Sequence, residues 1–393
     1  MIEPATPKDR REPRPAALAL GGLAALAAAI GIGRFVYTPI LPRMTQDLGM
    51  TKSAAGLLAS ANFAGYLTGA LLAATPALRG AGRRWLLLGL AASAVTTGAM
   101  ALPSSIVTLA ALRFAGGVAS AFVLVFASAL VLDRLSAAGR PDLAAVHFAG
   151  VGAGIAVSAV LVFVVAAWGG GWRALWLAGG LVSLLALPVA AGLMPDQLEM
   201  ADGQPSPAAP ASRRLTAFVA AYGLFGFGYV ITATFLIAII RGSPAVRFLE
   251  TPVWVVVGVA AAPSVALWTA VGKRIGIARA FALACATEAV GVAAGVLWIA
   301  PAGVFLAAIL LGGTFVGITA LGLIGGRRLS TGNPRRTLAV MTAAFGLGQI
   351  IGPAFGGAVY DATGSFLAPS LTAAAALLTG AILVAGTART ATC

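Results

Sequence analysis

The sequence predicts an all-helical membrane protein with twelve transmembrane helices in two six-helix halves, and three observations support this fold class. Only 10% of the 393 residues are charged and 60% are hydrophobic, with a mean hydropathy of +0.96. Soluble domains carry about 25% charged residues. Apolar runs recur that are long enough to cross a bilayer, which takes about 20 residues for about 30 Å of hydrocarbon. Parts of the first half also recur in the second half.

The elements follow from the apolar runs between charged residues, prolines and glycines. The expected spans cover residues 16–41, 54–78, 85–102, 105–132, 143–167 and 174–193, and then 215–240, 253–271, 280–299, 302–325, 337–359 and 366–386. Backbone groups inside a bilayer must be satisfied within the segment, so each run is expected to be a helix. The predicted organisation is a tail over 1–15, a bundle over 16–193, a proline-rich linker over 194–214, a second bundle over 215–386 and a tail over 387–393.

The basic residues orient these spans. If the N-terminus lies in the cytoplasm, most of the 26 Lys and Arg fall on the cytoplasmic side, as membrane proteins prefer. Only five fall on the opposite side: Arg43, Lys52, Arg173, Arg241 and Arg247. We therefore expect a multi-pass protein of the bacterial inner (plasma) membrane with both termini in the cytoplasm. The net charge of +14 encodes this topology and does not indicate a nucleic-acid partner.

An internal repeat relates the two halves. The segment GIGRFVYTPIL (31–41) overlays GFGYVITATFL (226–236), which places Arg34 on Tyr229. Nearly the same offset places Arg134-Leu135-Ser136 on Arg328-Leu329-Ser330. Two parallel six-helix repeats around an axis along the membrane normal are a transporter architecture, with the substrate bound near the midplane between them.

The chain also resembles the major facilitator superfamily. The fourth span carries RFAGGVASA (113–121), similar to the family's Arg followed by small residues at regular spacing. The run GRFVYTPILP (33–42) resembles the YbfB/YjiJ-type branch of that family. The resemblance implies that spans 1, 4, 7 and 10 line a central cavity. It also implies that the protein is a secondary transporter working by alternating access, and not an enzyme.

The loop after the second span matches the family pattern only in part. It ends Gly82-Arg83-Arg84, like the family's Asp-Arg-x-Gly-Arg-Arg loop. In the ungapped register Arg79 stands at the Asp position, so the resemblance does not carry over a gating salt bridge from this loop.

Two arginines lie inside predicted spans, where a charge costs at least about 2.5–3.5 kcal/mol. At about 1.5 Å per residue, Arg34 lies roughly 10 Å and Arg113 roughly 12 Å from the same face. Their guanidinium groups stay charged, and the planar fork suits a carboxylate or phosphate. We predict that both contact an anionic substrate. The alternative is structural, with either arginine bonding helix carbonyls.

Glu288 and His147 are candidates for proton coupling. Glu288 lies near the middle of the ninth span, where burial favours a neutral acid that can exchange a proton. His147 lies near the start of the fifth span and titrates close to neutral pH in its usual range. The alternative for each is a hydrogen bond that holds neighbouring helices together.

Uncharged polar side chains inside the spans complete the predicted pocket. Tyrosines supply an aromatic body with a hydroxyl tip, which suits an organic solute. The alternative is ordinary interhelical hydrogen bonding. The candidates are Tyr37, Asn62, Tyr66, Tyr222, Tyr229, Thr232 and Gln349.

These observations favour one function and leave two alternatives open. Two cysteines and a single histidine predict no metal site, and the absence of a phosphate-binding loop predicts no ATP hydrolysis and no cofactor. We predict a monomeric secondary transporter of a small organic solute, favouring an anion, with the lipid bilayer and protons as its other partners. The alternatives are proton-driven efflux of drug-like hydrophobic compounds and, as a different class, a membrane-embedded enzyme or sensor.

Overall fold

The structure is a computed structural model that describes residues 14–75, 78, 81–194, 212–330 and 334–389. Among these residues it contains helices and connecting turns and no strand. The first group of helices is α1 (Pro15–Leu26), η1 (Ala27–Ile32), α2 (Tyr37–Leu48), α3 (Lys52–Ala73), α4 (Gly82–Ala99), α5 (Ile106–Ala137), η3 (Pro141–Leu143), α6 (Ala144–Ala167) and α7 (Trp172–Leu193). The second group is α8 (Arg213–Arg241), η4 (Arg247–Leu249), α9 (Glu250–Ala261), α10 (Ser264–Ile275), α11 (Ile277–Leu297), α12 (Pro301–Arg328), α13 (Pro334–Thr363) and α14 (Leu367–Arg389).

Each predicted span coincides with helical structure, although the count of twelve spans is not reproduced. Ten helices among the described residues are long and apolar enough to cross a membrane. The bent pair α9 and α10, with 44° between the two parts, raises the number to eleven. The helix left over is α4, which has 18 residues and carries Arg83 and Arg84 in its first turn.

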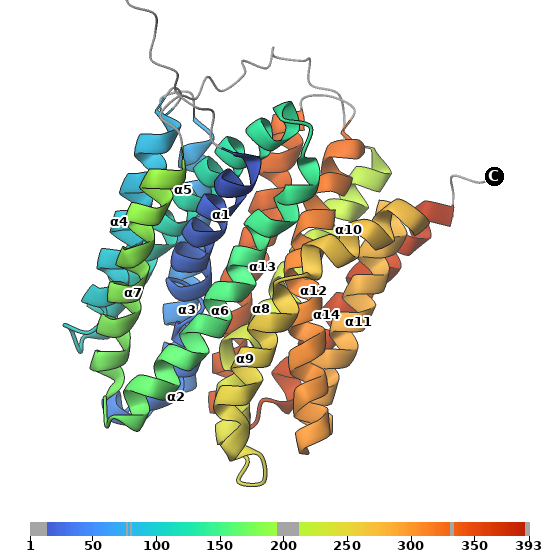
Figure 1. Cartoon of the computed structure of the whole chain (residues 1–393). Coiled ribbons are helices and arrows are strands. Elements are labelled where there is room, and N and C mark those ends of the chain that lie inside the picture. Colours follow the sequence, from blue (N-terminus) through green and yellow to red (C-terminus); the bar gives the residue numbers. More distant parts are fainter. Residues whose placement is uncertain (1–13, 76–77, 79–80, 195–211, 331–333, 390–393) are drawn as a thin grey trace, which may run out of the picture.

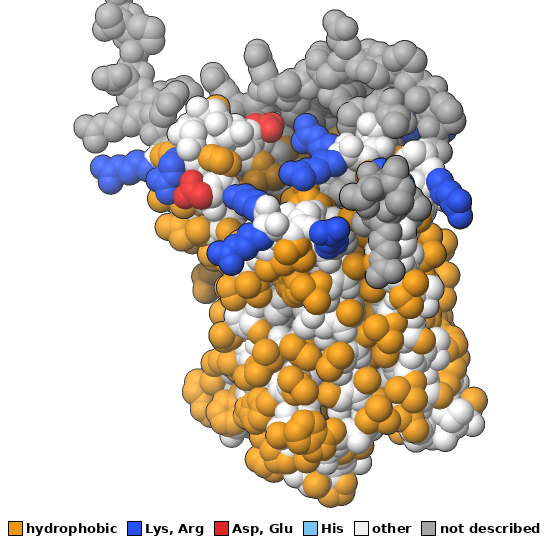
Figure 2. Space-filling view, turned by 90° about the vertical axis from the view of Figure 1, so that its right-hand side faces the viewer, with side chains coloured by type: hydrophobic (Ala, Val, Ile, Leu, Met, Phe, Trp, Pro, Cys, Tyr) orange, Lys and Arg blue, Asp and Glu red, His pale blue; other side chains and the backbone are white. Residues whose placement is uncertain are grey.

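The two ends of the bundle differ in what they hold. The start of α1, the end of α7 and the start of α8 lie at one end, which we call the linker end (Figure 1). We call the opposite end the far end. Figure 2 shows a band of Lys and Arg at the linker end and hydrophobic side chains over most of the face below it. Soluble proteins do not expose such a broad apolar face. Together with the ten or more helices long and apolar enough to cross a bilayer, it makes the chain a multi-pass membrane protein.

The first span is broken near its middle. The α-helix α1 continues as the π-helix η1, and a turn over residues 33–36 precedes α2. Pro39 cannot donate to the carbonyl of Phe35, which instead accepts from the amide of Thr38 at 3.2 Å. The break leaves carbonyl groups without their usual helical donors inside the span.

Helices of the two groups meet along α2 and α8, where positions related by the repeat touch one another. The hydroxyl of Thr38 donates to the carbonyl of Ala233 at 2.7 Å across 195 residues. This separation equals the offset that overlays Arg34 on Tyr229. Equivalent positions of a two-fold arrangement approach each other only near its axis, so this contact supports the predicted duplication.

A second junction joins α3 to α13 at the far end. The carboxylate of Asp361 accepts from the backbone amides of Lys52 and Ser53, at 3.0 and 2.8 Å, and so caps the N-terminus of α3. Further along the same pair of helices, the hydroxyl of Ser60 donates to the carbonyl of Ile350 at 2.6 Å. These bonds hold the far ends of the two groups together.

Glycines let α6 cross the broken first span at close range. A Cβ at Gly154 would collide with the backbone of Ala27, and one at Gly31 would collide with the backbone of Gly154. Small residues at such crossings allow helix backbones to touch in a membrane. The helix α6 is therefore packed directly against the broken segment.

This crossing yields a prediction about stability. Gly154→Ala should lower the stability of the protein by about 1–3 kcal/mol, because the added methyl group forces the two backbones apart. Gly192→Ala is the matched control, since nothing lies within 4 Å of a Cβ at that position. Thermal unfolding of the purified variants measures the difference. Equal melting temperatures for the two variants would contradict the close crossing.

Candidate functional site

Arg34 lies in the turn that breaks the first span, and it is buried. Its side chain is 7% exposed, and its Nη2 donates to the hydroxyl of Ser120 at 3.2 Å. The guanidinium carbon lies 4.1 Å from the ring centre of Tyr66 and 5.4 Å from that of Phe63. Its Nε has no hydrogen-bond partner among the described residues. The side chain is thus framed by aromatic rings and retains a free donor.

Arg113, from α5, binds the break itself. Its Nη1 and Nη2 donate to the carbonyls of Gly33 and Arg34 at 3.3 and 3.4 Å. The Arg34 carbonyl needs this donor because the Thr38 amide has turned to Phe35. The structural role considered for this arginine is therefore present in the structure, while contact with a substrate stays a prediction.

Aromatic and amide groups hold Arg113 in place. Its guanidinium carbon lies 4.7 Å from the ring centre of Tyr37 and 5.9 Å from that of Trp176. The Tyr37 hydroxyl donates to the carbonyl of Ala55 at 2.7 Å, and the Nδ2 of Asn62 donates to the carbonyl of Arg113 at 2.8 Å. Cation–π contacts stabilise the buried charge without neutralising it.

The two arginines lack a counter-charge in the part of the chain that the structure describes. The ion pairs found there join other residues, such as Arg140 with Asp142 and Arg241 with Glu250, near the ends of the bundle. Buried charges are normally paired, because desolvation costs several kcal/mol per ion. A site with two neighbouring buried cations and no acid is therefore suited to an anionic ligand.

Tyr229 lies at the centre of an aromatic cluster in the second group of helices. Its hydroxyl accepts a hydrogen bond from the Nε2 of Gln349. Its ring stacks against those of Phe225, Phe315 and Phe345, with centroids 5.0, 5.7 and 5.9 Å away. These faces form an aromatic wall that belongs to α8, α12 and α13.

Tyr222 extends this wall by two turns of α8. Its ring stacks on that of Phe345 at 4.8 Å, and its hydroxyl donates to the carbonyl of Thr319 at 3.2 Å. Thr232 lies one turn beyond Tyr229, and its buried hydroxyl has no partner among the described residues. Both side chains occupy the same helix as Tyr229.

The charged cluster and the aromatic wall meet across the two groups of helices. Phe35, next to Arg34, lies edge-on to Phe315 with 5.7 Å between ring centres. Arg34 also interacts electrostatically with Tyr229. The predicted substrate residues of the two halves are therefore brought together in the middle of the bundle.

The two proton-coupling candidates lie apart from each other. Glu288 is fully buried on α11, and neither carboxyl oxygen has a hydrogen-bond partner among the described residues. Its carboxyl group faces the hydroxyl of Thr314 on α12, the helix that also carries Phe315 of the aromatic wall. His147, also fully buried, lies in the first turn of α6, where its Nε2 is 3.1 Å from the hydroxyl of Ser128. It packs against Gly22 of α1.

The Gly82-Arg83-Arg84 motif, which follows the second span, supplies a side chain that caps the C-terminus of α7. The Nε and Nη2 of Arg83 donate to the carbonyls of Met194 and Ala191, at 2.9 and 2.7 Å, at the C-terminus of α7. A cation at this position satisfies carbonyl groups that lack helical donors. Gly82 is buried and Arg84 is exposed beside it, and Arg79 lies outside the described residues.

Sequence reasoning missed several members of the site, all without charge: Phe63, Trp176, Phe315 and Phe345. One of them had a signal, because the 195-residue offset places Phe315 on Ser120. Contact between Arg34 and Ser120 in one half thus corresponds to contact between Tyr229 and Phe315 in the other. A chain with 18 phenylalanines gives no comparable signal for Phe63 or Phe345.

The residues that the structure describes include no group of three or more His, Cys, Asp or Glu side chains that could hold a metal ion. What they offer at the centre is charge, hydrogen-bond donors and aromatic faces. This helical membrane bundle, with a polar and aromatic centre between two groups of helices, belongs to the class of transporters.

Solved structures share this fold. The chain is similar to the crystal structure of the nucleoside transporter NupG, with a TM-score of 0.70, 15% identity, and 95% of this chain and 99% of that chain covered. A mutant of NupG with a single substitution gives a TM-score of 0.72 at 16% identity, with coverage of 94% and 99%. A bacterial homolog of the human lysosomal transporter Spinster, inward-facing and unoccupied, gives 0.64 at 13% identity, with coverage of 95% and 96%.

The sequence itself identifies the family. Residues 26–385 match the family described as uncharacterised MFS-type transporter YbfB, and the chain belongs to this family of major facilitator transporters. The resemblance and the predicted all-helical, major-facilitator-like fold are thereby confirmed, apart from the count of twelve spans, and the family consists of transporters rather than enzymes. A gallate transporter of Pseudomonas putida is 28% identical over 198 residues, which are 50% of this chain and 42% of that relative.

The contacts of Arg113 yield a prediction. Arg113→Lys should lower the stability by about 1–3 kcal/mol, because one ammonium group cannot reproduce the fork that serves both carbonyls and a buried carbonyl is left unpaired. Thermal unfolding of the purified protein measures this loss. Arg84→Lys, at an exposed position near the linker end, is the control and should leave the melting temperature unchanged. An unaltered melting temperature for Arg113→Lys would show that the break holds without the fork.

Proposed function

We propose that this transporter moves a small organic anion through a site formed by Arg34, Arg113 and the aromatic wall around Tyr229. The two groups of helices rock about this site and expose it alternately to each side of the membrane. Tyr37, Asn62 and Tyr66 border the cationic part of the site, and Tyr222, Thr232 and Gln349 border the aromatic part. A monomer carries every residue of the proposed site.

One observation carries this proposal. Arg34 is a buried guanidinium with a free Nε donor and without an acidic partner in the described part of the chain. A permanent cation at bilayer depth marks a candidate functional site by default. A carboxylate would accept hydrogen bonds from Arg34, and the rings of Phe63 and Tyr66 beside the guanidinium would receive the apolar part of the ligand.

The name of one relative is in accord with this substrate class. Gallate is an aromatic carboxylate, and the relative that carries it in its name aligns with half of this chain. A planar ring with a carboxylate matches a site with guanidinium groups on one side and stacked aromatic rings on the other. We therefore take aromatic carboxylates as the substrates to be tested first.

We also propose that protons drive this transport. The carboxyl group of Glu288 is fully buried, and it faces Thr314 on α12, next to Phe315 of the aromatic wall. Release of its proton would place a negative charge near the substrate, and uptake of the proton would remove it. His147 is a second candidate, placed near the linker end.

The expected orientation completes the proposal. We place the linker end in the cytoplasm of a bacterial cell because the band of Lys and Arg lies there (Figure 2). The far end then faces the outside of the inner membrane. In this orientation the bonds of Thr38 and Asp361 close the outer side of the transporter.

The role of Arg34 is tested by transport in proteoliposomes. Arg34→Gln should reduce the uptake of radiolabelled benzoate or gallate about tenfold or more, because a neutral amide replaces the charge that binds the carboxylate. Arg84→Gln, outside the site, should transport at the wild-type rate. Undiminished uptake by Arg34→Gln would refute its part in the site.

The matched neutral amide, benzamide, separates the two transport hypotheses. Selective transport of benzoate over benzamide is expected for an anion site. Equal transport of both, or selectivity for uncharged aromatic compounds, would favour efflux of drug-like molecules, for which the stacked rings at Tyr229 also provide a surface.

Coupling to protons is tested at Glu288. Glu288→Gln should abolish the accumulation of substrate driven by a pH gradient, because the amide carries no exchangeable charge. Exchange of labelled for unlabelled substrate without a gradient should continue. Thr287→Ala, the neighbouring residue, is the control. Gradient-driven accumulation that survives in Glu288→Gln would exclude this residue as the coupling group.

Orientation is tested with reporters fused to the C-terminus. A cytoplasmic reporter such as green fluorescent protein should be active, whereas alkaline phosphatase, which requires the periplasm, should be inactive. The reverse pattern would overturn the assignment of the linker end to the cytoplasm.

A further inference from the structure

A cavity of about 240 Å³ lies at the far end, away from the arginines at the centre of the bundle. It is formed by the far ends of four helices, α2, α6, α8 and α9. Two of these belong to the first group of helices and two to the second. None of the residues of the proposed transport site lines this cavity.

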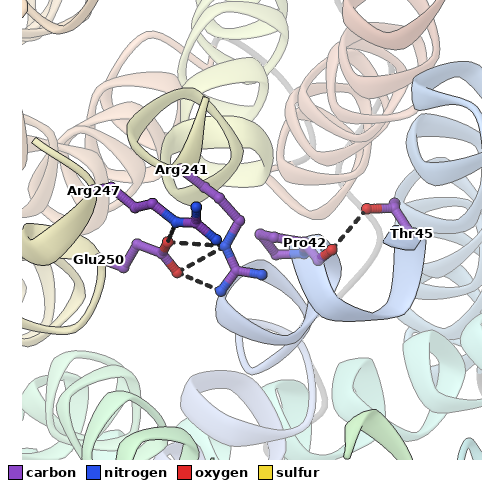
Figure 3. Close-up of polar contacts among 5 residues, drawn as sticks. All are labelled: Pro42, Thr45, Arg241, Arg247 and Glu250. Carbon is purple, nitrogen blue, oxygen red and sulfur yellow. Dashed lines mark hydrogen bonds and ion pairs between the residues drawn. The ribbon is translucent and has the colours of Figure 1, made fainter. Parts of the chain in front are cut away.

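The charges around this cavity leave a positive excess. Arg43, Arg241 and Glu250 line it. The Nε of Arg241 donates to both carboxylate oxygens of Glu250 at 2.8 and 2.9 Å, and Arg247 approaches the same carboxylate at 3.8 Å (Figure 3). The single carboxylate is therefore already shared by two guanidinium groups.

Arg43 is the charge that remains. It lines the cavity from α2, and it has no hydrogen bond or ion pair with the rest of the described chain. Its side chain is only partly exposed. A half-buried cation at the wall of a cavity attracts an anion more strongly than a fully solvated one does.

Apart from Thr251, the remaining wall of the cavity is apolar, and it includes two aromatic residues. Trp254 from α9 and Phe163 from α6 line it, together with Val162 and Ile237. The indole Nε1 of Trp254 is already used, since it donates to the hydroxyl of Ser158 at 3.2 Å. Trp254 is 1% exposed, so its ring lies behind the wall in a fixed position, whereas Phe163 is 57% exposed and offers the accessible aromatic surface.

We propose that this far-end cavity is a second binding site for a small aromatic carboxylate, with Arg43 binding the carboxylate, Phe163 contacting the ring and the buried Trp254 lying directly behind the wall. Its volume is below the usual 300–1,000 Å³ of pockets for drug-sized ligands, so it suits a single ring. Because the walls come from both groups of helices, the cavity exists only while their far ends are together. The bound anion therefore stabilises the form that is closed at the far end, and it acts as an effector of the transport cycle.

Fluorine NMR at Trp254 tests this proposal at the site itself. The protein is labelled with 5-fluorotryptophan in nanodiscs of zwitterionic phosphatidylcholine, and the Trp254 signal among the seven tryptophans is assigned with Trp254→Phe. Benzoate should shift this signal saturably, and benzamide should not. Arg43→Gln should weaken the benzoate response about tenfold or more. Arg173→Gln, a far-end arginine outside the cavity, is the matched control and should respond as the wild type does.

Three results would overturn the proposal: equal responses to benzoate and benzamide, a wild-type response in Arg43→Gln, or a shift of the Trp254 signal on adding phosphatidylglycerol alone. The last would assign the cavity to a lipid headgroup. Arg34→Gln should leave the response unchanged, so the test is independent of the proposed transport site. Loss of the response in Arg34→Gln would instead mean that benzoate acts from the central site.

Hydrogen exchange tests the effect on the cycle. Benzoate should slow the exchange of backbone amides at the far ends of α8 and α9 in the wild type, and it should have no effect in Arg43→Gln. Unchanged exchange in the wild type under saturating benzoate would refute stabilisation of the closed far end.

Discussion

The fork of hydrogen bonds from Arg113 to the carbonyls of Gly33 and Arg34 is the contact on which the centre of this protein depends. A break in a transmembrane helix leaves backbone groups that no water can satisfy, and each costs several kcal/mol if it stays unpaired. Arg113 supplies the missing donors from α5, and α6 packs against the same segment at Gly154. The break in turn places Arg34 in a turn between two helical pieces, where its side chain reaches Ser120 and the ring of Tyr66.

Much of this arrangement could be predicted from the sequence, because the relevant signals are local or periodic. Lengths of apolar runs predict spans, and the distribution of Arg and Lys predicts which ends share a side. The repeat predicts that Arg34 and Tyr229 occupy equivalent places, and the structure brings their surroundings together through the rings of Phe35 and Phe315. The count of spans differs from the prediction because α4 carries two arginines in its first turn and because α9 and α10 are bent relative to one another.

The sequence does not predict the direction in which each buried side chain points or the group that it contacts. Depth along a helix follows from counting residues, and Arg34 and Arg113 were expected at the same level for this reason. Which carbonyl or ring each one meets depends on helix rotation and packing, which a sequence of mostly Ala, Leu, Val and Gly leaves open. Contacts between Arg113 and Trp176, or between Tyr229 and Phe345, therefore had no signal. The π-helix η1 is also not predicted by the sequence, because Gly31 and Gly33 permit several backbone conformations.

The closed far end has an unusual kind of robustness to sequence change. The bonds of Thr38 to Ala233, of Ser60 to Ile350 and of Asp361 to Lys52 and Ser53 each join one side chain to a main-chain group. Every residue carries a backbone carbonyl, and every residue except proline carries an amide. Substitutions at Ala233, Ile350, Lys52 or Ser53 can therefore leave these bonds in place as long as the helix backbones keep their positions. Half of each junction is carried by the backbone alone, so two halves that diverge after a duplication can still close on each other.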